Sequence, residues 1–194
     1  MKRPQYLPLF RLWHWLTAFS VLGLFATVAL RSTFLDKKAN AQIILNKLAS
    51  ISIDQEQAVA VAKAIRTPMW EWHYLLGFLL AAAVAWRVFL MLRGQARMPL
   101  LKLLQAQGLH EKGKAAIHLL ICLGILVMTV TGLFYYFCDS ESFHWVKEIH
   151  QSLLWPMVIL VLLHIGGVLT HELSTKECIV SKMIHGDEEA SQKR

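Results

Sequence analysis

Four stretches of the 194-residue chain are long and apolar enough to cross a lipid bilayer. They cover residues 12–30, 72–92, 115–137 and 149–170, and each is interrupted only by isolated polar or ionisable residues. A membrane-spanning helix needs about 20 mostly apolar residues, and its backbone N–H and C=O groups must bond to one another because water is absent. We therefore predict an all-α integral membrane protein, built as a four-helix bundle in one domain that covers residues 1–194.

Composition and cysteine usage support this class of protein. Hydrophobic residues make up 56% of the chain and charged residues 17%, whereas a soluble domain carries about 25% charged residues. The first apolar stretch follows Lys2 and Arg3, but it exceeds the roughly 7–15 apolar residues of a signal peptide, so we expect it to be retained. The three cysteines form neither a CxxC pair nor a CxxCH site, which argues against a disulfide framework and a covalently attached haem.

Lysines and arginines beside the apolar stretches indicate the orientation of the chain. Residues 93–114 carry five of them against one acid, whereas residues 138–148 are acidic. The positive-inside rule therefore places both termini, the connection 93–114 and the tail 171–194 in the cytoplasm. The long connection 31–71 carries both basic and acidic residues, and long connections count for less in the positive-inside rule. The net charge of +7 follows from this topology, and no basic–aromatic pattern indicates binding to nucleic acid.

The connection 31–71 is the one sizeable extramembrane segment, and the topology places it on the outer side. Good helix formers fill residues 54–65, Ser52 or Asp54 is placed to cap the start of that helix, and residues 41–48 suit a second short helix. We favour an amphipathic hairpin that lies on the outer membrane surface. The alternative is a docking platform for a redox partner.

Five of the nine histidines fall within or at the ends of the apolar stretches: His14, His73, His118, His150 and His164. Ionisable residues are costly inside a membrane and by default indicate function. His150 and His164 are fourteen residues apart, just under four helical turns. On one helix they would share a face about 21 Å apart along the axis, which suits two porphyrins stacked across a bilayer.

The depths of the histidines group them into two level pairs. The chain enters the first stretch from the cytoplasm and the second and fourth from outside, so His14 and His164 lie near the cytoplasmic face. His73 and His150 lie near the outer face. Each pair comes from two helices, as ligation of a haem iron by two imidazoles requires. We therefore predict these four histidines as the iron ligands of two b-type haems.

Three cationic side chains and a glycine accompany the predicted ligands. Arg11 and Lys147 each precede a ligand by three residues on the same helix face, where they suit the haem propionates. Arg87 follows the ligand of the second stretch by fourteen residues. We favour a propionate or quinone contact for it over an interfacial, snorkelling role. Gly77, four residues after the same ligand, leaves room for a flat macrocycle, with helix packing as the equal alternative.

The remaining histidines have weaker roles. His118 lies level with the cytoplasmic pair, where it could replace either ligand, relay protons, contact a quinone or serve as an ordinary interfacial residue. We predict it to be functional but not a first-choice ligand. His171 is a weaker candidate for the same roles, and we expect His110, His144 and His185 to be solvated.

Several motifs are shared with a known family. They are R-x-W-H-W at residues 11–15, H-x-x-x-G followed by arginine at His73, Gly77 and Arg87, T-G at residues 131–132, the His150/His164 pair and the tail sequence at residues 171–186. With them the chain resembles the bacterial di-haem cytochromes b, which comprise cytochrome b561 and the cytochrome b subunits of nickel–iron hydrogenases and formate dehydrogenases. The connection 31–71 is longer than in either branch, and the G-H-N-P motif of the hydrogenase branch is missing before the third stretch.

The resemblance implies a multi-pass protein of the bacterial inner membrane with two b haems. It would transfer electrons between ubiquinone or menaquinone and a periplasmic redox protein or catalytic subunit, as the membrane subunit of an oxidoreductase and with no catalytic residue assigned. We expect the quinone near the cytoplasmic haem, among His164, His118 and Arg87. One alternative is a self-sufficient b561-type enzyme that oxidises, for example, superoxide; another is a transporter or structural anchor. Membrane lipid surrounds the bundle, and a homo-oligomer is compatible with this interpretation.

Overall fold

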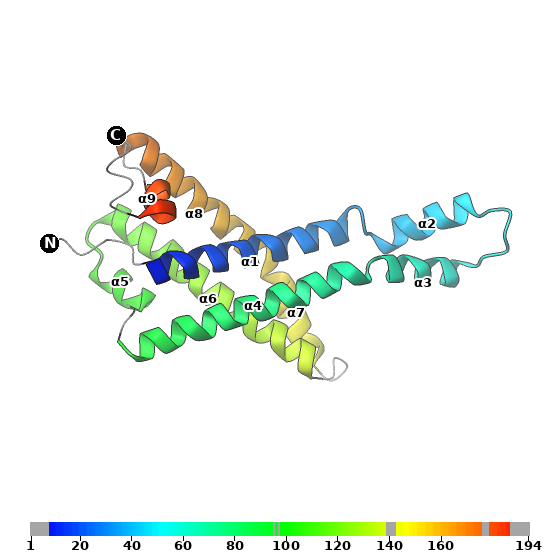
Figure 1. Ribbon diagram of the computed structural model, residues 1–194, viewed down its shortest axis with the longest axis horizontal. Coiled ribbons are helices and arrows are strands. Elements are labelled where there is room, and N and C mark those ends of the chain that lie inside the picture. The colour runs from blue at the N-terminus through cyan, green and yellow to red at the C-terminus, as the bar shows by residue number, and fades with distance from the viewer. Residues whose placement is uncertain (1–7, 95, 97, 139–142, 176–178, 187–194) are drawn as a thin grey trace. The chain divides into compact units, whose positions relative to one another are not determined.

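The computed structural model describes residues 8–94, 96, 98–138, 143–175 and 179–186 (Figure 1). These residues form nine α-helices and no strand. The helices are α1 (Pro8–Ser32), α2 (Lys37–Lys47), α3 (Gln55–Ile65), α4 (Thr67–Leu92), α5 (Pro99–Gln105), α6 (Leu109–Phe137), α7 (His144–Ser152), α8 (Leu154–Thr175) and α9 (Ile179–His185). Lys2 and Arg3, which bear on the predicted topology, and the charged end of the tail at residues 187–194 lie outside the described residues.

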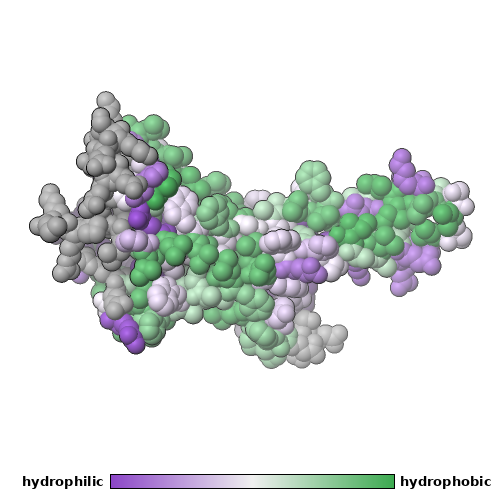
Figure 2. Space-filling model, in the orientation of Figure 1, coloured by the Kyte–Doolittle hydropathy of each residue, from purple (hydrophilic) through white to green (hydrophobic). Residues whose placement is uncertain are grey.

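Four segments within the described residues are long and apolar enough to span a membrane: α1, α4, α6 and the combined segment His144–Thr175. They confirm the predicted all-α membrane fold, and each is longer than its predicted apolar stretch. Large apolar side chains such as Leu12 and Trp155 are exposed, at 67% and 70%. Figure 2 shows hydrophobic side chains over the membrane-length helices on the face in view. Lipid rather than water is the solvent that such a surface requires.

The chain divides into two compact units. Unit 1 comprises Met1–Thr17 and Ala81–Arg194, and unit 2 comprises Ala18–Leu80. In unit 1, α6 packs against α5, α7 and α8, and α9 packs against α8. Gly124 brings α6 close to α8, because a Cβ atom there would overlap the sulfur of the buried Met157. Small residues commonly permit such close approach between membrane helices.

The fourth span, His144–Thr175, contains the predicted stretch 149–170 but consists of two consecutive helices. Helix α7 ends at Ser152 and α8 begins at Leu154, so His150 and His164 lie on consecutive helices of one membrane-length segment. Pro156 supplies the physical reason, since it has no N–H group to donate to the carbonyl four residues earlier. The backbone bond from Met157 N to Leu153 O, at 3.0 Å, carries the chain across the break.

Unit 2 is an antiparallel helix pair with a helical hairpin at its end. Gly23 of α1 faces Leu76 of α4, where a Cβ atom on the glycine would lie 2.7 Å from the leucine Cδ1. Figure 1 shows α2 and α3 side by side, extending beyond the ends of α1 and α4. Their small core consists of Ala41, Ala58 and Ala62. The two predicted short helices are therefore present, and they project along the helix pair instead of folding back against it.

Two aspartates cap the hairpin helices. The Asp54 carboxylate accepts a bond from Gln57 N at 2.7 Å, and the Gln57 side chain accepts one from Asp54 N at 3.1 Å, which forms a capping box. This confirms Asp54 rather than Ser52 as the cap of α3. Asp36 accepts from the backbone N–H groups of Ala39 and Lys38, and these bonds lower the pKa of its carboxyl. The stabilisation of α2 by this cap is therefore fully present when the pH is above the ordinary carboxyl pKa. It is lost as the pH falls through the lowered pKa of Asp36.

We predict that Asp54→Ala loosens α3. Loss of a side-chain N-cap costs about 1 kcal/mol, so the first backbone N–H groups of α3 should exchange with deuterium faster. Hydrogen–deuterium exchange of the detergent-purified protein measures this effect. Asp54→Asn keeps an acceptor and should exchange like the parent chain. Equal exchange in the alanine and asparagine variants would argue against the capping role.

Candidate functional site

His14 and His164 face each other in unit 1. His14 lies on α1 and His164 on α8, and their ring centres are 6.3 Å apart with the planes inclined at 56°. The ring of Phe10 stacks on His14 at 6.5 Å, and Trp15 meets it edge-on at 5.8 Å. The structure thus brings together the two histidines that the sequence predicts as the cytoplasmic pair.

The spacing of this pair suits one metal atom between the two rings. An imidazole nitrogen binds a metal at about 2 Å and lies about 1 Å from its ring centre, so imidazoles on opposite faces of one iron have ring centres about 6 Å apart. The observed 6.3 Å meets this requirement. Over the described residues, no group of three or more His, Cys, Asp or Glu side chains could hold a metal ion. A haem iron needs only two protein ligands, because the porphyrin supplies the others.

Arg87 lies beside the same pair. Its guanidinium stands over the rings of Trp13 and Phe10, at 5.0 and 5.7 Å from their centres. Trp13 donates its indole N–H to the Ala83 carbonyl at 2.9 Å, which ties α1 to α4 within unit 1. The cation is therefore held next to His14 on a platform of two aromatic rings.

Arg11 and Trp15 bind the C-terminal end of α9. Arg11 Nη1 donates to the Ile184 carbonyl and Trp15 Nε1 to the Met183 carbonyl, both at 3.1 Å. A cation is favourable at a helix C-terminus, where carbonyl groups lack partners. Arg11 Nε is buried and has no hydrogen-bond partner among the described residues. This orphaned donor, one turn from His14, fits an acidic group of a bound cofactor.

His118 lies on α6 in the same unit as His14, His164 and Arg87. Its Nε2 lies 3.8 Å from the sulfur of Cys122, one turn further along α6. The cysteine had no predicted role.

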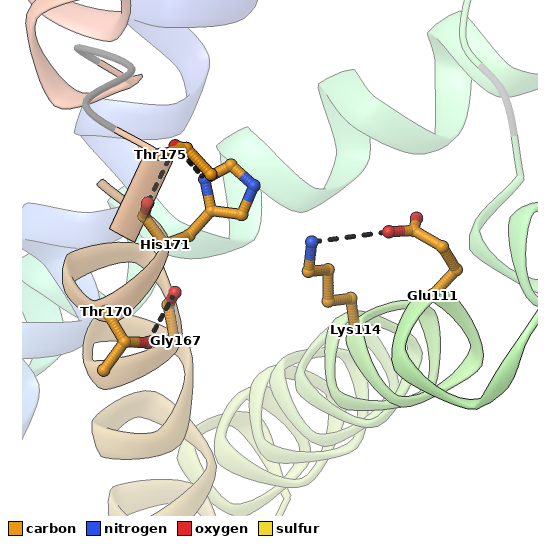
Figure 3. A network of polar contacts seen from close by, with 6 residues as sticks. All are labelled: Glu111, Lys114, Gly167, Thr170, His171 and Thr175. Atoms are coloured by element: carbon orange, nitrogen blue, oxygen red, sulfur yellow. Dashed lines mark hydrogen bonds and ion pairs between the residues drawn. The ribbon is translucent and has the colours of Figure 1, made fainter. Parts of the chain in front are cut away.

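His171 differs from His118, because its ring turns back to its own helix (Figure 3). Thr175 Oγ1 contacts His171 Nδ1 at 3.3 Å and donates to the His171 carbonyl at 2.8 Å. The ion pair drawn in Figure 3 joins Lys114 to Glu111 at 3.4 Å on α6.

His150, of the predicted outer pair, lies against α6 in unit 1. Its Nδ1 is 3.1 Å from the hydroxyl of Thr131. A Cβ atom on Gly132 would lie 3.1 Å from His150 Cε1, so the glycine leaves room for the imidazole. Lys147 Nζ lies 5.9 Å from the ring centre of Tyr135. The T-G motif of the third span thus forms the surface that receives His150.

His73, the other predicted outer ligand, lies in unit 2. Its Nδ1 is 2.7 Å from the hydroxyl of Thr27 on α1. Trp70 meets its ring edge-on at 5.6 Å, and the Arg31 guanidinium lies 5.4 Å from the Trp70 ring centre. No heavy atom of the described residues comes within 4 Å of a Cβ atom added to Gly77. That open face can accept a flat group.

Membrane-length helices that present imidazoles in this way have the architecture of a membrane cytochrome of the b type. The family model described as prokaryotic cytochrome b561 matches residues 5–186. The chain belongs to the prokaryotic cytochrome b561 family. It is therefore a multi-pass membrane protein of the inner membrane, a haem b protein of electron transfer.

A curated relative comes from Rhizobium leguminosarum bv. viciae, where it is named "Probable Ni/Fe-hydrogenase B-type cytochrome subunit". It is 23% identical to the chain over 217 aligned residues, which cover 91% of this chain and 84% of the relative. No solved structure matches the chain.

The sequence interpretation missed the threonine contacts of the outer histidines. A signal for them was present. Thr27 follows His14 by thirteen residues, and Thr131 follows His118 by the same number. At 1.5 Å per residue, a threonine thirteen residues from a histidine near the cytoplasmic face lies about 20 Å deeper, at the level of the outer histidines.

We predict that Gly132→Val lowers the haem content of the purified protein, because the branched side chain would displace the His150 ring. The pyridine haemochrome assay measures this change. Gly113→Val is the matched control, since it places the same residue in the same helix, where no described atom lies within 4 Å of the added Cβ. Equal haem loss in both variants would show that valine in α6, rather than crowding of His150, is responsible.

Proposed function

We propose that the chain is the membrane subunit of an oxidoreductase and transfers electrons between the quinone pool and a redox partner on the periplasmic side. In this proposal two b haems are bound, one by His14 and His164 and the other by His73 and His150. The observation that carries the proposal is the 6.3 Å separation of the His14 and His164 rings, which suits a shared iron. Haem b supplies one-electron exchange when it is bound.

The spacing of the ligands along the chain supports two haem levels. His150 and His164 are separated by fourteen residues, as are His73 and Arg87. Each pair lies within one membrane-length segment, where at the helical rise this separation corresponds to about 21 Å and covers most of the roughly 30 Å hydrocarbon core of a bilayer. Two haems at these levels would carry an electron across most of the membrane.

Cationic side chains would hold the propionates. Arg11 has a buried donor without a partner in the described residues, and Arg87 is fixed over two aromatic rings beside His14. Lys147 lies one turn before His150 and serves the outer level in this proposal. Gly77 leaves the space beside His73 open for the macrocycle.

The quinone, ubiquinone or menaquinone, would bind at the cytoplasmic level among His164, His118 and Arg87. Reduction of a quinone takes up protons as well as electrons, so a titratable side chain at its carbonyl oxygen is required. His118 suits this role because its imidazole is titratable and it belongs to the same unit as His14 and His164. Arg87 can donate to the second polar group of the ring or to a propionate.

Two observations support a partner protein. The Rhizobium relative is named as a subunit, which implies a complex, and the α2–α3 hairpin of this chain exposes apolar side chains on both helices. Ile43 of α2 is 56% exposed and Val61 of α3 is 48% exposed. The hairpin projects from the ends of α1 and α4 that the predicted topology places outside, where a periplasmic partner would meet it (Figure 1).

A self-sufficient quinone-linked oxidoreductase, for example one that oxidises superoxide, is the second candidate function. The placement of His118 favours it, because a third-span histidine is the feature in which the chain resembles cytochrome b561 itself. Purified protein distinguishes the two functions. Fast quinone reduction by a small donor without another subunit would favour the self-sufficient enzyme.

We predict that substitutions of the four histidines fall into two groups. His14→Ala and His164→Ala should remove one haem, and His73→Ala and His150→Ala the other, because each haem would lose one of the two histidines proposed to hold it. Haem content and reduced-minus-oxidised spectra of the purified variants measure this outcome.

His144→Ala is the control for these substitutions, since the His144 side chain is exposed and contacts Glu148 at 3.2 Å. It should keep both haems. If His14→Ala and His73→Ala removed the same spectral component, the pairing would be wrong. A colourless parent protein from haem-replete cells would refute the proposed function altogether.

We also predict that His118→Ala and Arg87→Leu slow quinone-linked electron transfer by about 100-fold per bound haem, because proton transfer and quinone binding are impaired. Stopped-flow reoxidation of the reduced haems by a water-soluble quinone measures the rate. His171→Ala is the control, since the His171 ring is engaged by Thr175 on its own helix. An unchanged rate in both variants, with full haem content, would place the quinone elsewhere.

A further inference from the structure

Both outer histidines contact a threonine hydroxyl through the same ring atom. Thr27 Oγ1 lies 2.7 Å from His73 Nδ1 in unit 2, and Thr131 Oγ1 lies 3.1 Å from His150 Nδ1 in unit 1. In each case the threonine belongs to a membrane-length helix and the histidine to another helix. The same contact therefore occurs independently in the two units.

The direction of these hydrogen bonds follows from the single hydrogen of a hydroxyl group. Thr27 Oγ1 donates its hydrogen to the Leu24 carbonyl at 2.7 Å, and Thr131 Oγ1 donates to the Val127 carbonyl at 2.7 Å. A carbonyl oxygen can only accept, so each hydroxyl has lone pairs but no hydrogen left for the imidazole. The histidine must then donate from Nδ1.

This donation selects one tautomer of each imidazole. A neutral imidazole carries one N–H, so donation from Nδ1 places the lone pair on Nε2. A metal ligand requires that lone pair, and a bond at the other ring nitrogen fixes both tautomer and ring orientation. In an apolar membrane an imidazole N–H without an acceptor would cost about 1–3 kcal/mol, which the threonine oxygen avoids.

We propose that Thr27 and Thr131 are positioning residues of the outer haem, which hold His73 and His150 with Nδ1–H bonded and Nε2 directed to the iron. The inference rests on the proposed ligation of this haem by the two histidines. A partner for Nδ1–H also raises the electron donation of an imidazole. The threonines therefore stabilise the oxidised iron and lower the midpoint potential of the outer haem.

The surroundings of each threonine agree with this role. Thr27 is buried, with 6% of its surface exposed. Thr131 is followed by Gly132, which leaves room for the His150 ring. The Thr27 contact, at 2.7 Å, is shorter than the Thr131 contact, at 3.1 Å. Removal of the Thr27 hydroxyl should therefore have the larger effect.

Paired substitutions test the hydroxyl separately from the shape of the side chain. Thr27→Val keeps the shape and removes the acceptor, whereas Thr27→Ser keeps the acceptor; the same pair applies to Thr131. Redox titration of the purified protein, followed in the haem α band, measures both midpoint potentials. The component retained in His14→Ala identifies the outer haem.

For Thr27→Val we expect the ratio of reduced to oxidised outer haem at a fixed potential to rise about three- to tenfold, which is an upward shift of about 30–60 mV for one electron. Thr27→Ser should restore the parent value, and the inner haem should not change. Thr131→Val should shift the outer haem in the same direction by less. If Thr27→Val loses the outer haem, its retention by Thr27→Ser supports the proposal and its loss from both contradicts it.

Thr129→Val and Thr170→Val are the controls. Thr129 lies two residues from Thr131, and its buried hydroxyl has no partner among the described residues. Thr170 donates to the Gly166 carbonyl, at 2.8 Å, as Thr27 and Thr131 donate to their own helices. Neither variant should move a potential.

Two results would overturn the inference. An outer potential that stays unchanged in both valine variants, with both haems bound, would refute it and leave the proposed function intact. Equal shifts in the serine and valine variants would show that the methyl group, not the hydroxyl, is responsible. Absence of haem from the parent protein would instead refute the proposed function itself.

Discussion

An imidazole inside a bilayer presents two ring nitrogens that water cannot satisfy, so each nitrogen needs a partner from the protein or from a bound group. The structure meets this constraint in two ways. His73 and His150 contact threonines on neighbouring helices. His118 contacts the sulfur of Cys122 one turn along its own helix. A contact between helices also fixes the distance between the two helices and their rotation about their axes. His73 and His150, the proposed ligands of the outer haem, therefore also contribute to helix packing.

This form of packing matters because the described residues contain few buried apolar side chains. In a bilayer the lipid is as apolar as the helix surfaces, and association depends on close packing and on polar contacts between helices. Gly124 and Met157 provide the close packing of α6 on α8. Residues 11–15 provide polar contacts, since Trp13 donates to a carbonyl of α4 while Trp15 and Arg11 donate to carbonyls of α9. The segment that carries His14 is thereby fixed by several neighbours in unit 1.

The four spans could be predicted from the sequence, because bilayer thickness and helical rise set their length. Neighbours around a helix could not, since they depend on how helices rotate against one another. The sequence predicts a propionate beside Arg11, yet its Nη1 donates to the tail helix, which is a tertiary contact. The helix end before Pro156 could not be predicted either, because the sequence alone does not decide whether a proline near the end of a span interrupts the helix. In the sequence, the one signal for Thr27 and Thr131 was that each follows a histidine by thirteen residues.

The two ends of unit 1 differ in ways that bear on redox chemistry. A cation lies near each end, since Arg87 is held over Trp13 at the His14 end and Lys147 precedes His150 by one turn and lies 5.9 Å from the Tyr135 ring centre. At the His150 end, the ring nitrogen contacts the oxygen of Thr131, and electron donation through such a bond favours the oxidised form. The contact with the threonine hydroxyl is therefore the feature that distinguishes the His150 end. Two haems bound at these levels would therefore have unequal midpoint potentials, and the inner haem would be easier to reduce. Downhill electron transfer from an outer partner to a quinone at the inner level requires this order of potentials.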